Sequence, residues 1–290
     1  MEKHSKKRLF CEISPATYYI SLQKEILKRK LKNLFHREHY AHDRRRELLP
    51  VVVAAQRGGM IKRGPGIDPI LQQNKADNIR LACSRIDAIV VAPGETFSFW
   101  RLVGKTSKRN GFAEGRVLRN GRLVAGVGGG LCNLANTICV VALHSPLTLT
   151  ELHHHSDALA PDPEGRRVPY SAGTSVNYNF VDLRFRNDTD QPVQLHTWCE
   201  GDDLHAELRT TKPFPFVYRL TEEDHHFRQE ADGRYFRCSR IYRETLDRST
   251  GELLERELNW NNHSEVLFDY ALIPKEQIKP SPVPPRKFRG

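Results

Sequence analysis

The 290-residue chain carries 45 Lys and Arg residues against 35 Asp and Glu residues, which gives a formal net charge of +10 at pH 7. Its hydrophobic fraction of 39% and charged fraction of 28% are those of an ordinary globular protein, and they exclude a largely disordered or membrane-embedded chain. At this length we expect one large domain, or a core domain with additions.

Targeting and spanning segments are not expected. No apolar stretch approaches the ~18–20 continuous residues that a transmembrane helix needs, and the charged start, Met1 to Lys7, is not followed by the apolar region of a secretion signal. The six cysteines are widely spaced and form no Cys-x-x-Cys pair, so neither a zinc knuckle nor a disulfide framework is indicated. We therefore expect a cytoplasmic protein with reduced thiols.

The N-terminal segment, residues 1–66, is expected to be basic and helical and to end in a linker. Between Met1 and Glu47 lie 13 Lys and Arg residues against 6 Asp and Glu residues. From Ala16 to Leu49, apolar residues recur at approximate helical spacing, which predicts one amphipathic helix or a pair. Such a segment can attract an acidic partner, an anionic membrane surface or nucleic acid, although a solvated helix face explains the charge equally well. Glycines and prolines between Arg57 and Pro69 predict the linker.

A core domain is expected over residues 67–211. An apolar repeat at i, i+3, i+4 and i+7 predicts a helix that ends near Asp87, and it is formed by Ile79, Ala82, Cys83 and Ile86. Val90 and Val91 predict a short strand. The Asn120-Gly121 pair between apolar runs is the strongest short-range signal for a β-hairpin.

The glycine triplet Gly128, Gly129 and Gly130 follows this hairpin and precedes a helix predicted from Leu131 to about Leu143. Successive glycines before a helix let several N–H groups point into one concavity, where an anion is stabilised. Cys132 lies in the first turn, where the helix dipole is expected to lower the pKa of its thiol. The alternative is that Cys132 packs as a small apolar residue and the glycines only form a tight junction.

A histidine cluster lies on the next predicted strand, Leu147 to His155. Strand alternation places His153 and His155 on one face with Glu151, and His154 on the other face. Two adjacent imidazoles can serve as general base and orienter for a cysteine, or as metal ligands. A polar, exposed strand end is the alternative interpretation.

The order of these residues along the chain is that of a cysteine, histidine and acid site for acyl transfer. Asp182 on a later strand supplies the acid, with Asp157 as its rival. Zinc bound by Cys132, His153 and His155 lacks a clear fourth ligand and is the weaker option. We therefore predict neither a metal nor a cofactor.

The rest of the chain is predicted to be rich in strands. Three antiparallel strands are expected in the core, over residues 177–186, 193–199 and 204–209. Alternating charged and apolar stretches predict a β-rich extension over residues 212–276, and the proline-rich residues 277–290 predict a disordered tail. The fold class is thus α+β, with a mixed helix and antiparallel-sheet core between a basic helical N-terminal segment and a β-rich C-terminal extension.

Four motifs resemble those of the VanW family, in order and at compatible spacings over roughly residues 78–195. They are Pro93–Phe99, Val127–Cys132, His153–Ser156 and Val181–Asp190. The resemblance implies an accessory link to glycopeptide (vancomycin) resistance or cell-wall metabolism in bacteria, with no established reaction. It maps the family's His-x-His-Ser pattern onto His153, His155 and Ser156. Asn133 stands where the family usually carries Gln, so its amide would reach less far toward an oxyanion.

Two functions are weighed. The first is a cysteine-dependent acyl transferase or amidase that acts on a cell-wall precursor, with Cys132 as nucleophile, His153 or His155 as base, and the glycine-loop amides as oxyanion donors. The second is a non-enzymatic binding module, in which the glycine loop and Asn133 hold a carboxylate or phosphate of a precursor or partner. Nucleic-acid binding through residues 1–49 is a third hypothesis.

Overall fold

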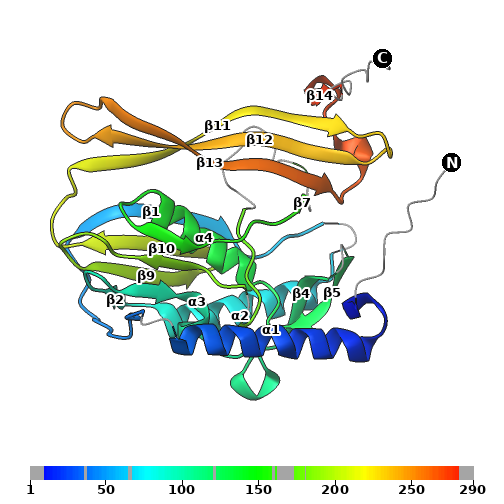
Figure 1. Ribbon diagram of the computed structural model, residues 1–290, viewed down its shortest axis with the longest axis horizontal. Coiled ribbons are helices and arrows are strands. Elements are labelled where there is room, and N and C mark those ends of the chain that lie inside the picture. Colours follow the sequence, from blue (N-terminus) through cyan, green and yellow to red (C-terminus); the bar gives the residue numbers. More distant parts are fainter. Residues whose placement is uncertain are drawn as a thin grey trace, which may run out of the picture.

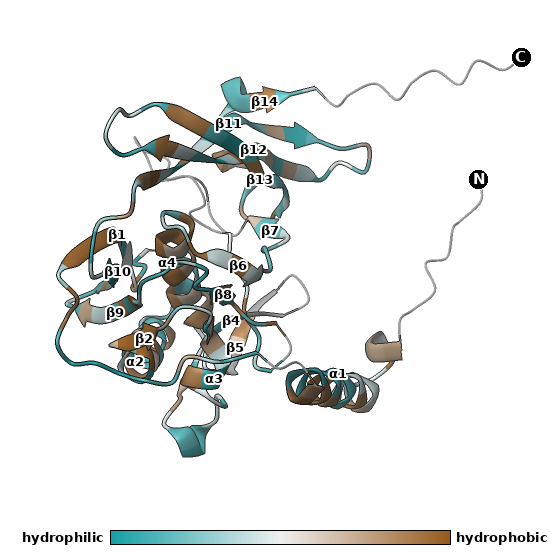
Figure 2. Ribbon diagram, turned by 60° about the vertical axis from the view of Figure 1, so that its left-hand side comes forward, coloured by the Kyte–Doolittle hydropathy of each residue, from teal (hydrophilic) through white to brown (hydrophobic). Residues whose placement is uncertain are grey.

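The computed structural model describes residues 10–35, 38–64, 67–119, 122–158, 161, 173–179 and 181–280. It confirms the α+β class, because its helices combine with several mainly antiparallel sheets and a strand-rich C-terminal region. In Figures 1 and 2, a long C-terminal sheet lies at one end of the molecule and helix α1 (Pro15–Phe35) lies at the other.

A four-stranded antiparallel sheet with strand order β1-β10-β9-β2 forms the centre of the core. Its strands are β1 (Val51–Gly59), β2 (Ile89–Val91), β9 (Val193–Glu200) and β10 (Asp203–Thr210). The predictions for residues 193–199 and 204–209 are confirmed. In β10 the alternating residues Leu204, Ala206 and Leu208 are fully buried, so one face of this sheet is covered.

Two helices pack against this sheet and against each other. Helix α2 (Pro69–Ile86) begins after Asp68, whose carboxylate accepts hydrogen bonds from the N–H groups of Ile70 and Leu71 at 2.8 and 3.3 Å. Helix α4 (Leu131–Leu143) has ten of its 13 residues buried and packs against β1 and β10. Because α4 is apolar on nearly every side, it is the central helix of the core.

Smaller elements complete the core. The predicted hairpin is confirmed as β4 (Glu114–Arg119) and β5 (Arg122–Val127), paired in a continuous antiparallel register. A second sheet has the order β3-β8-β6, and the short helix α3 follows directly after β3. These elements are β3 (Thr96–Ser98), α3 (Phe99–Val103), η2 (Lys108–Asn110), β6 (Thr148–Glu151) and β8 (Arg184–Arg186).

Two strand predictions were too long. The strand expected to reach His155 ends at Glu151, and the strand expected over residues 177–186 is regular only from Arg184. In the remaining parts of these two segments there are isolated β-bridges in place of continuous strand pairing. One bridge joins His154 to Thr174, and the other joins Asn177 to Val181. The alternating pattern was present in the sequence, but only part of each segment has a neighbouring strand with which to pair.

The C-terminal sheet has the strand order β14-β11-β12-β13-β7 and confirms the predicted β-rich region. Its members are β7 (Asp157–Ala158), β11 (Phe216–Gln229), β12 (Tyr235–Asp247), β13 (Leu253–Val266) and β14 (Ile278–Lys279), with η3 (Tyr270–Leu272) and η4 (Lys275–Gln277) before β14. Strand β14 falls within the predicted tail 277–290, and residues 281–290 lie outside the described residues.

The N-terminal helix is shorter than predicted. Helix α1 follows η1 (Phe10–Glu12) and ends at Phe35, and no described residue from 38 to 49 is helical. Instead Tyr40 bridges to Thr96, Arg44 bridges to Ile89, and the N–H of Leu49 donates to the side chain of Gln194. These bonds to core strands replace the helical ones, so tertiary contacts override the helical spacing of this stretch.

The predicted linker is also partly wrong, because Arg57, Gly58 and Gly59 belong to strand β1, which pairs with β10. The division of the chain at residues 66, 211 and 276 stays a prediction. Among the described residues, no helix is both long and apolar enough to cross a membrane.

Candidate functional site

The glycine triplet turns the chain from β5 into α4, as predicted, and each of its members is in a position that favours glycine. Gly128 has φ +82°, and an added Cβ there would be 2.7 Å from the side chain of Thr106. Gly130 is the residue before the helix and has φ +104°, a conformation that favours glycine. Gly129 lies against the backbone of β4, where an added Cβ would be 2.4 Å from the carbonyl carbon of Gly115. Asn78 holds this junction from α2, since its Nδ2 donates to the carbonyl of Gly129 at 3.0 Å.

The N–H groups of the triplet are mostly used within the turn. Gly128 donates to the carbonyl of Ala113 at 3.0 Å, and Gly129 donates to that of Gly126 at 3.2 Å. No side chain caps the start of α4. Within its first turn the N–H of Asn133 donates to the carbonyl of Gly130, so the N–H groups of Leu131 and Cys132 are the ones left without an intrahelical acceptor. The predicted concavity of free donors is therefore confined to the first turn of α4.

Three cationic side chains gather near this turn. Lys75 of α2 lies against Gly130, where an added Cβ would be 2.4 Å from the Cγ of the lysine. Burial, together with the nearby charges of Lys62 and Arg116, lowers the pKa of Lys75 to about 8. Burial and Arg116 also lower the pKa of Lys62. Within the described residues none of the three forms an ion pair, so their positive charges are uncompensated.

Sequence reasoning missed these cations. A signal for one of them exists, because Lys75 precedes Ile79, Ala82 and Ile86 at helical spacing and so falls on the apolar stripe of α2. A lysine on a buried stripe is uncommon and indicates a special environment. Lys62 and Arg116 come from other parts of the chain, and no local pattern singles them out.

Asn133 holds the first turn of α4 against the central sheet. Its Nδ2 donates to the carbonyl of Gly59 at the end of β1, at 3.0 Å. Its backbone N–H donates to the carbonyl of Gly130 at 2.9 Å. The predicted ligand-binding amide of Asn133 therefore already has a protein acceptor.

Cys132 lies under the segment that contains Val176. Its Sγ lies 3.6 Å from the carbonyl oxygen of Val176 and is placed to donate to it. Burial raises the pKa of the Cys132 thiol. The predicted lowering of this pKa was wrong in direction, because the helix terminus was considered without the segment that covers it.

The three histidines have separate surroundings. His153 lies with its Nε2 3.3 Å from Oε1 of Glu151, which confirms that these two share a face. His154 stacks on Trp260 of the C-terminal sheet, with ring centroids 4.2 Å apart. His155 is partly buried, which lowers the pKa of its imidazole. Cys132 contacts a carbonyl, whereas His153 contacts a carboxylate, so the structure does not join them by a hydrogen bond.

Asp182 is buried and fully engaged at the start of α3. One oxygen accepts from the hydroxyl of Ser98 at 2.6 Å and from Nε of Arg184 at 2.8 Å. The other oxygen accepts from the N–H groups of Trp100 and Leu183 at 3.1 and 3.0 Å. None of these partners is a histidine, so the contacts of Asp182 are those of a structural carboxylate.

Asp182 belongs to a larger charged network that anchors α1. Arg184 also donates to Tyr40 at 2.7 Å and to Asn33 of α1 at 2.9 Å. Arg29 of α1 binds Glu151 through two hydrogen bonds of 2.5 Å. Burial of Glu151 opposes its ionisation, but the hydrogen bonds from Arg29 and from the Asp182 N–H and the charge of Arg184 outweigh it and lower its pKa.

The three candidate zinc ligands are not brought together. Among the described residues, no three His, Cys, Asp or Glu side chains come close enough together to hold a metal ion. All three candidate ligands, Cys132, His153 and His155, are described. All six cysteines are free.

A family model for VanW like protein matches residues 74–209. Residues 74–209 therefore form a VanW-like region. The chain is 27% identical over 229 residues to the vancomycin B-type resistance protein VanW of Enterococcus faecalis, covering 79% of this chain and 82% of that protein. It is 31% identical over 136 residues to the uncharacterized protein YoaR of Bacillus subtilis, covering 47% of this chain and 43% of that protein. No solved structure matches the chain.

The VanW-like region contains the glycine triplet, Cys132, the histidines and Asp182, together with Lys75 and Arg116. Lys62 precedes it and strands β11 to β13 follow it. The VanW-like region therefore supplies most of the site at the start of α4.

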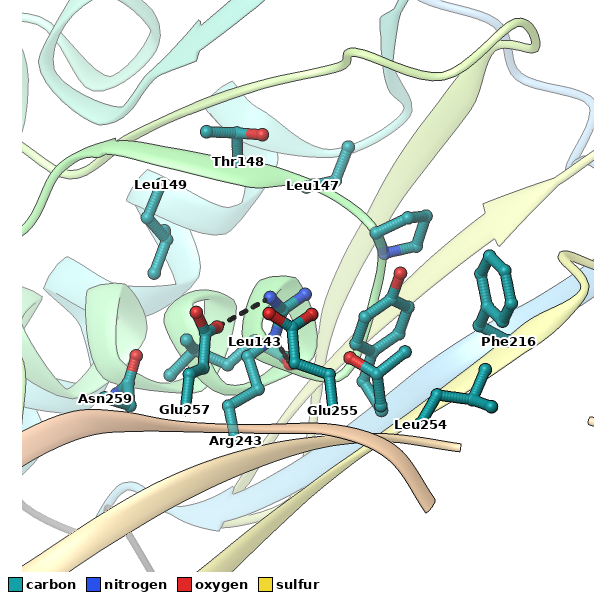
Figure 3. Close-up of a pocket in the computed structure, with 13 residues that line it drawn as sticks. Leu143, Leu147, Thr148, Leu149, Phe216, Arg243, Leu254, Glu255, Glu257 and Asn259 are labelled. Carbon is teal, nitrogen blue, oxygen red and sulfur yellow. Dashed lines mark hydrogen bonds and ion pairs between the residues drawn. The ribbon is translucent and has the colours of Figure 1, made fainter. Parts of the chain in front are cut away.

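A cleft of about 860 Å³ lies between the end of α4 in the VanW-like region and the C-terminal sheet. Figure 3 shows Arg243 at its centre, with Glu257 beside it at 3.2 Å. Arg243 also donates to the carbonyls of Leu143 and Ser145 at 3.0 and 2.6 Å, so it caps the end of α4 and joins β12 to it. Because α4 is about 20 Å long, this cleft is separate from the site at its start.

The raised pKa of Cys132 predicts slow alkylation at neutral pH. A thiol is alkylated as its thiolate, so the rate at Cys132 is expected to keep rising with pH above about 9. Iodoacetamide labelling followed by peptide mass spectrometry measures this rate, with the buried Cys83 as internal comparison. Rapid labelling of Cys132 near pH 7 would contradict the prediction and support a nucleophilic cysteine.

Proposed function

We propose that this VanW-like protein is an accessory protein connected to vancomycin resistance, and that it binds an anionic group of a cell-wall precursor at the start of α4. The similarity to a relative that is named a vancomycin B-type resistance protein supports the first part. The observation that carries the second part is the group of Lys62, Lys75 and Arg116 beside the uncapped first turn of α4.

An anion at this position would relieve two unfavourable features at once. It would accept hydrogen bonds from the first-turn N–H groups, and it would compensate three positive charges that repel one another. A phosphate and a carboxylate share this chemistry, so either group of a precursor is a suitable ligand. The raised pKa of Cys132 and the separate contacts of His153 favour this binding role over a cysteine-dependent transferase.

Replacing Lys75 with Gln is expected to weaken anion binding at least about tenfold, since one charge-assisted hydrogen bond contributes about 1.5–3 kcal/mol. Titration calorimetry of the full chain measures the affinity, with two probes: inorganic phosphate and an acetylated dipeptide that has a free carboxylate. The amidated dipeptide serves as the ligand control. Lys212→Gln is the matched control variant, because Lys212 is an exposed lysine on the turn after β10.

The pH dependence has a defined sign. Without an anion the pKa of Lys75 is about 8, so its charge is lost as pH rises through that value, and affinity should fall there. At pH values below this range the affinity should be nearly constant. Near pH 8, binding of the anion should be accompanied by proton uptake. Cys132→Ser should bind as the unaltered chain does. Equal affinity in Lys75→Gln, or loss of binding in Cys132→Ser, would refute the proposed role.

A further inference from the structure

Helix α1 presents a row of large aliphatic side chains that nothing in the described chain covers. Ile20, Leu27 and Leu31 are 56%, 57% and 46% exposed, and Leu34 is 76% exposed. Their spacing of i, i+7, i+11 and i+14 places them on one side of the helix, which we call the aliphatic stripe. No residue of α1 is buried. A stripe of this size on a described helix calls for an apolar partner.

A different side of α1 faces the body of the protein. Leu22, Ile26, Arg29 and Asn33 recur at i, i+4, i+7 and i+11, and each is partly buried. Arg29 binds Glu151, and Asn33 accepts from Arg184, so polar contacts fix this side. At 100° per residue the aliphatic stripe is rotated by roughly 140° from it. The stripe therefore points away from the body, and α1 lies at the periphery in both views (Figures 1 and 2).

Exposed lysines border the aliphatic stripe on both sides. At 100° per residue, Lys24, Lys28 and Lys32 lie about 50°, 90° and 130° from the centre of the stripe on one side of the helix, and Lys30 lies about 70° from it on the other. The only acidic residue of α1, Glu25, is paired with Lys28 at 2.9 Å. An apolar side bordered by lysines is the pattern of helices that lie in the interface of an anionic lipid layer.

We propose that α1 lies flat on an anionic lipid surface, with its aliphatic stripe among the acyl chains and its lysines at the headgroups. The helix is 21 residues and about 31 Å long, and its orientation against the body leaves the whole stripe available. The contacts of Arg29 and Asn33 hold the core above the surface. This attachment would keep the protein at the membrane face, and it is independent of the anion site at the start of α4.

A second copy of the chain fits the stripe less well. In a two-helix seam Ile20, Leu27 and Leu34 would occupy d positions, and Lys24 would occupy an a position between them. The stripe and its borders offer no carboxylate to pair with Lys24, because Glu25 lies on another side. Nucleic acid would use the lysines but would leave four aliphatic side chains in water. An anionic lipid surface uses both features.

The experiment is co-sedimentation of the full chain with vesicles of phosphatidylcholine alone or mixed with phosphatidylglycerol. Binding is expected only to the mixed vesicles and should weaken with added salt. Leu27→Asn with Leu31→Asn should weaken binding at least about tenfold, and Lys28→Gln with Lys32→Gln should do the same. Leu253→Asn with Leu254→Asn is the matched control, since these β13 leucines are about half exposed and lie outside α1.

Each of the following outcomes would overturn the proposal that α1 binds an anionic lipid surface. Sedimentation equal in both vesicle types, or absent from both, would exclude an anionic lipid surface. A concentration-dependent dimer that Leu27→Asn dissociates would assign the stripe to a second copy. Binding to duplex DNA that survives Leu27→Asn with Leu31→Asn, without vesicle binding, would assign the lysines to nucleic acid. All altered residues are exposed, so unchanged thermal unfolding serves as the check on folding.

Discussion

Gly129→Ala is expected to lower the free energy of unfolding by more than about 3 kcal/mol, or to prevent folding. The added Cβ would lie 2.4 Å from the carbonyl carbon of Gly115 and 2.6 Å from the backbone N of Arg116. These are backbone atoms of β4, which pairs with β5 residue by residue, so neither can rotate away as a side chain could. Urea unfolding followed by circular dichroism measures the loss.

Gly59→Ala is the matched control for this substitution. No atom lies within 4 Å of a Cβ added at Gly59, and its backbone is not in the left-handed region. The change should alter the free energy of unfolding by less than about 0.5 kcal/mol. If Gly129→Ala proved as stable as Gly59→Ala, the glycine turn would not pack against β4 as described, and the site at the start of α4 would lose its support.

The glycine triplet shows what a sequence can reveal about such a site. Three successive glycines before a helical pattern indicated a geometric demand, and the turn into α4 confirms it. The nature of that demand was not predictable, because Gly129 must be small on account of Gly115, which approaches it only after β4 and β5 have paired. The local sequence pattern therefore predicted the position of the turn. The need for a small residue at Gly129 arises from the pairing of β4 with β5.

Cys132 shows where a local rule gives the wrong sign. A helix start lowers the pKa of a thiol when the thiol is near solvent, and the sequence places Cys132 at such a start. The segment around Val176 covers it from 44 residues further along the chain, and the resulting burial has the larger effect. Spacing along a sequence carries no information on which distant segment covers a residue.

The N-terminal region shows the same limit for secondary structure. Helical spacing correctly predicted α1, yet it also extended the helix from Phe35 to Leu49, where no proline or glycine interrupts it. Tyr40 and Arg44 instead form bridges to core residues. The basic group at the start of α4 was missed for a related reason, because Lys62, Lys75 and Arg116 converge only in the folded chain.

Asp182→Ala is expected to lower the free energy of unfolding by about 3–5 kcal/mol, because it leaves a buried charge without its main partner. Asp182 is 3% exposed and Arg184 is 4% exposed, and they are joined at 2.8 Å. The remaining carboxylates near Arg184 are farther away, with Glu38 at 3.2 Å and Glu151 at 3.6 Å. The first turn of α3 would also lose an acceptor for the N–H of Trp100.

Asp188→Ala is the matched control, because Asp188 forms its ion pair with Arg186 at 2.5 Å near the surface, where solvent screens the charges. Unfolding in urea should separate the two variants clearly, with Asp188→Ala close to the unaltered chain. Asp182→Asn, which keeps the acceptor oxygen and removes the charge, should fall between them. If Asp182→Ala instead unfolded like Asp188→Ala, the carboxylate would not be needed for stability. A catalytic role for Asp182 would then regain support, since its four hydrogen bonds would no longer be accounted for by the fold.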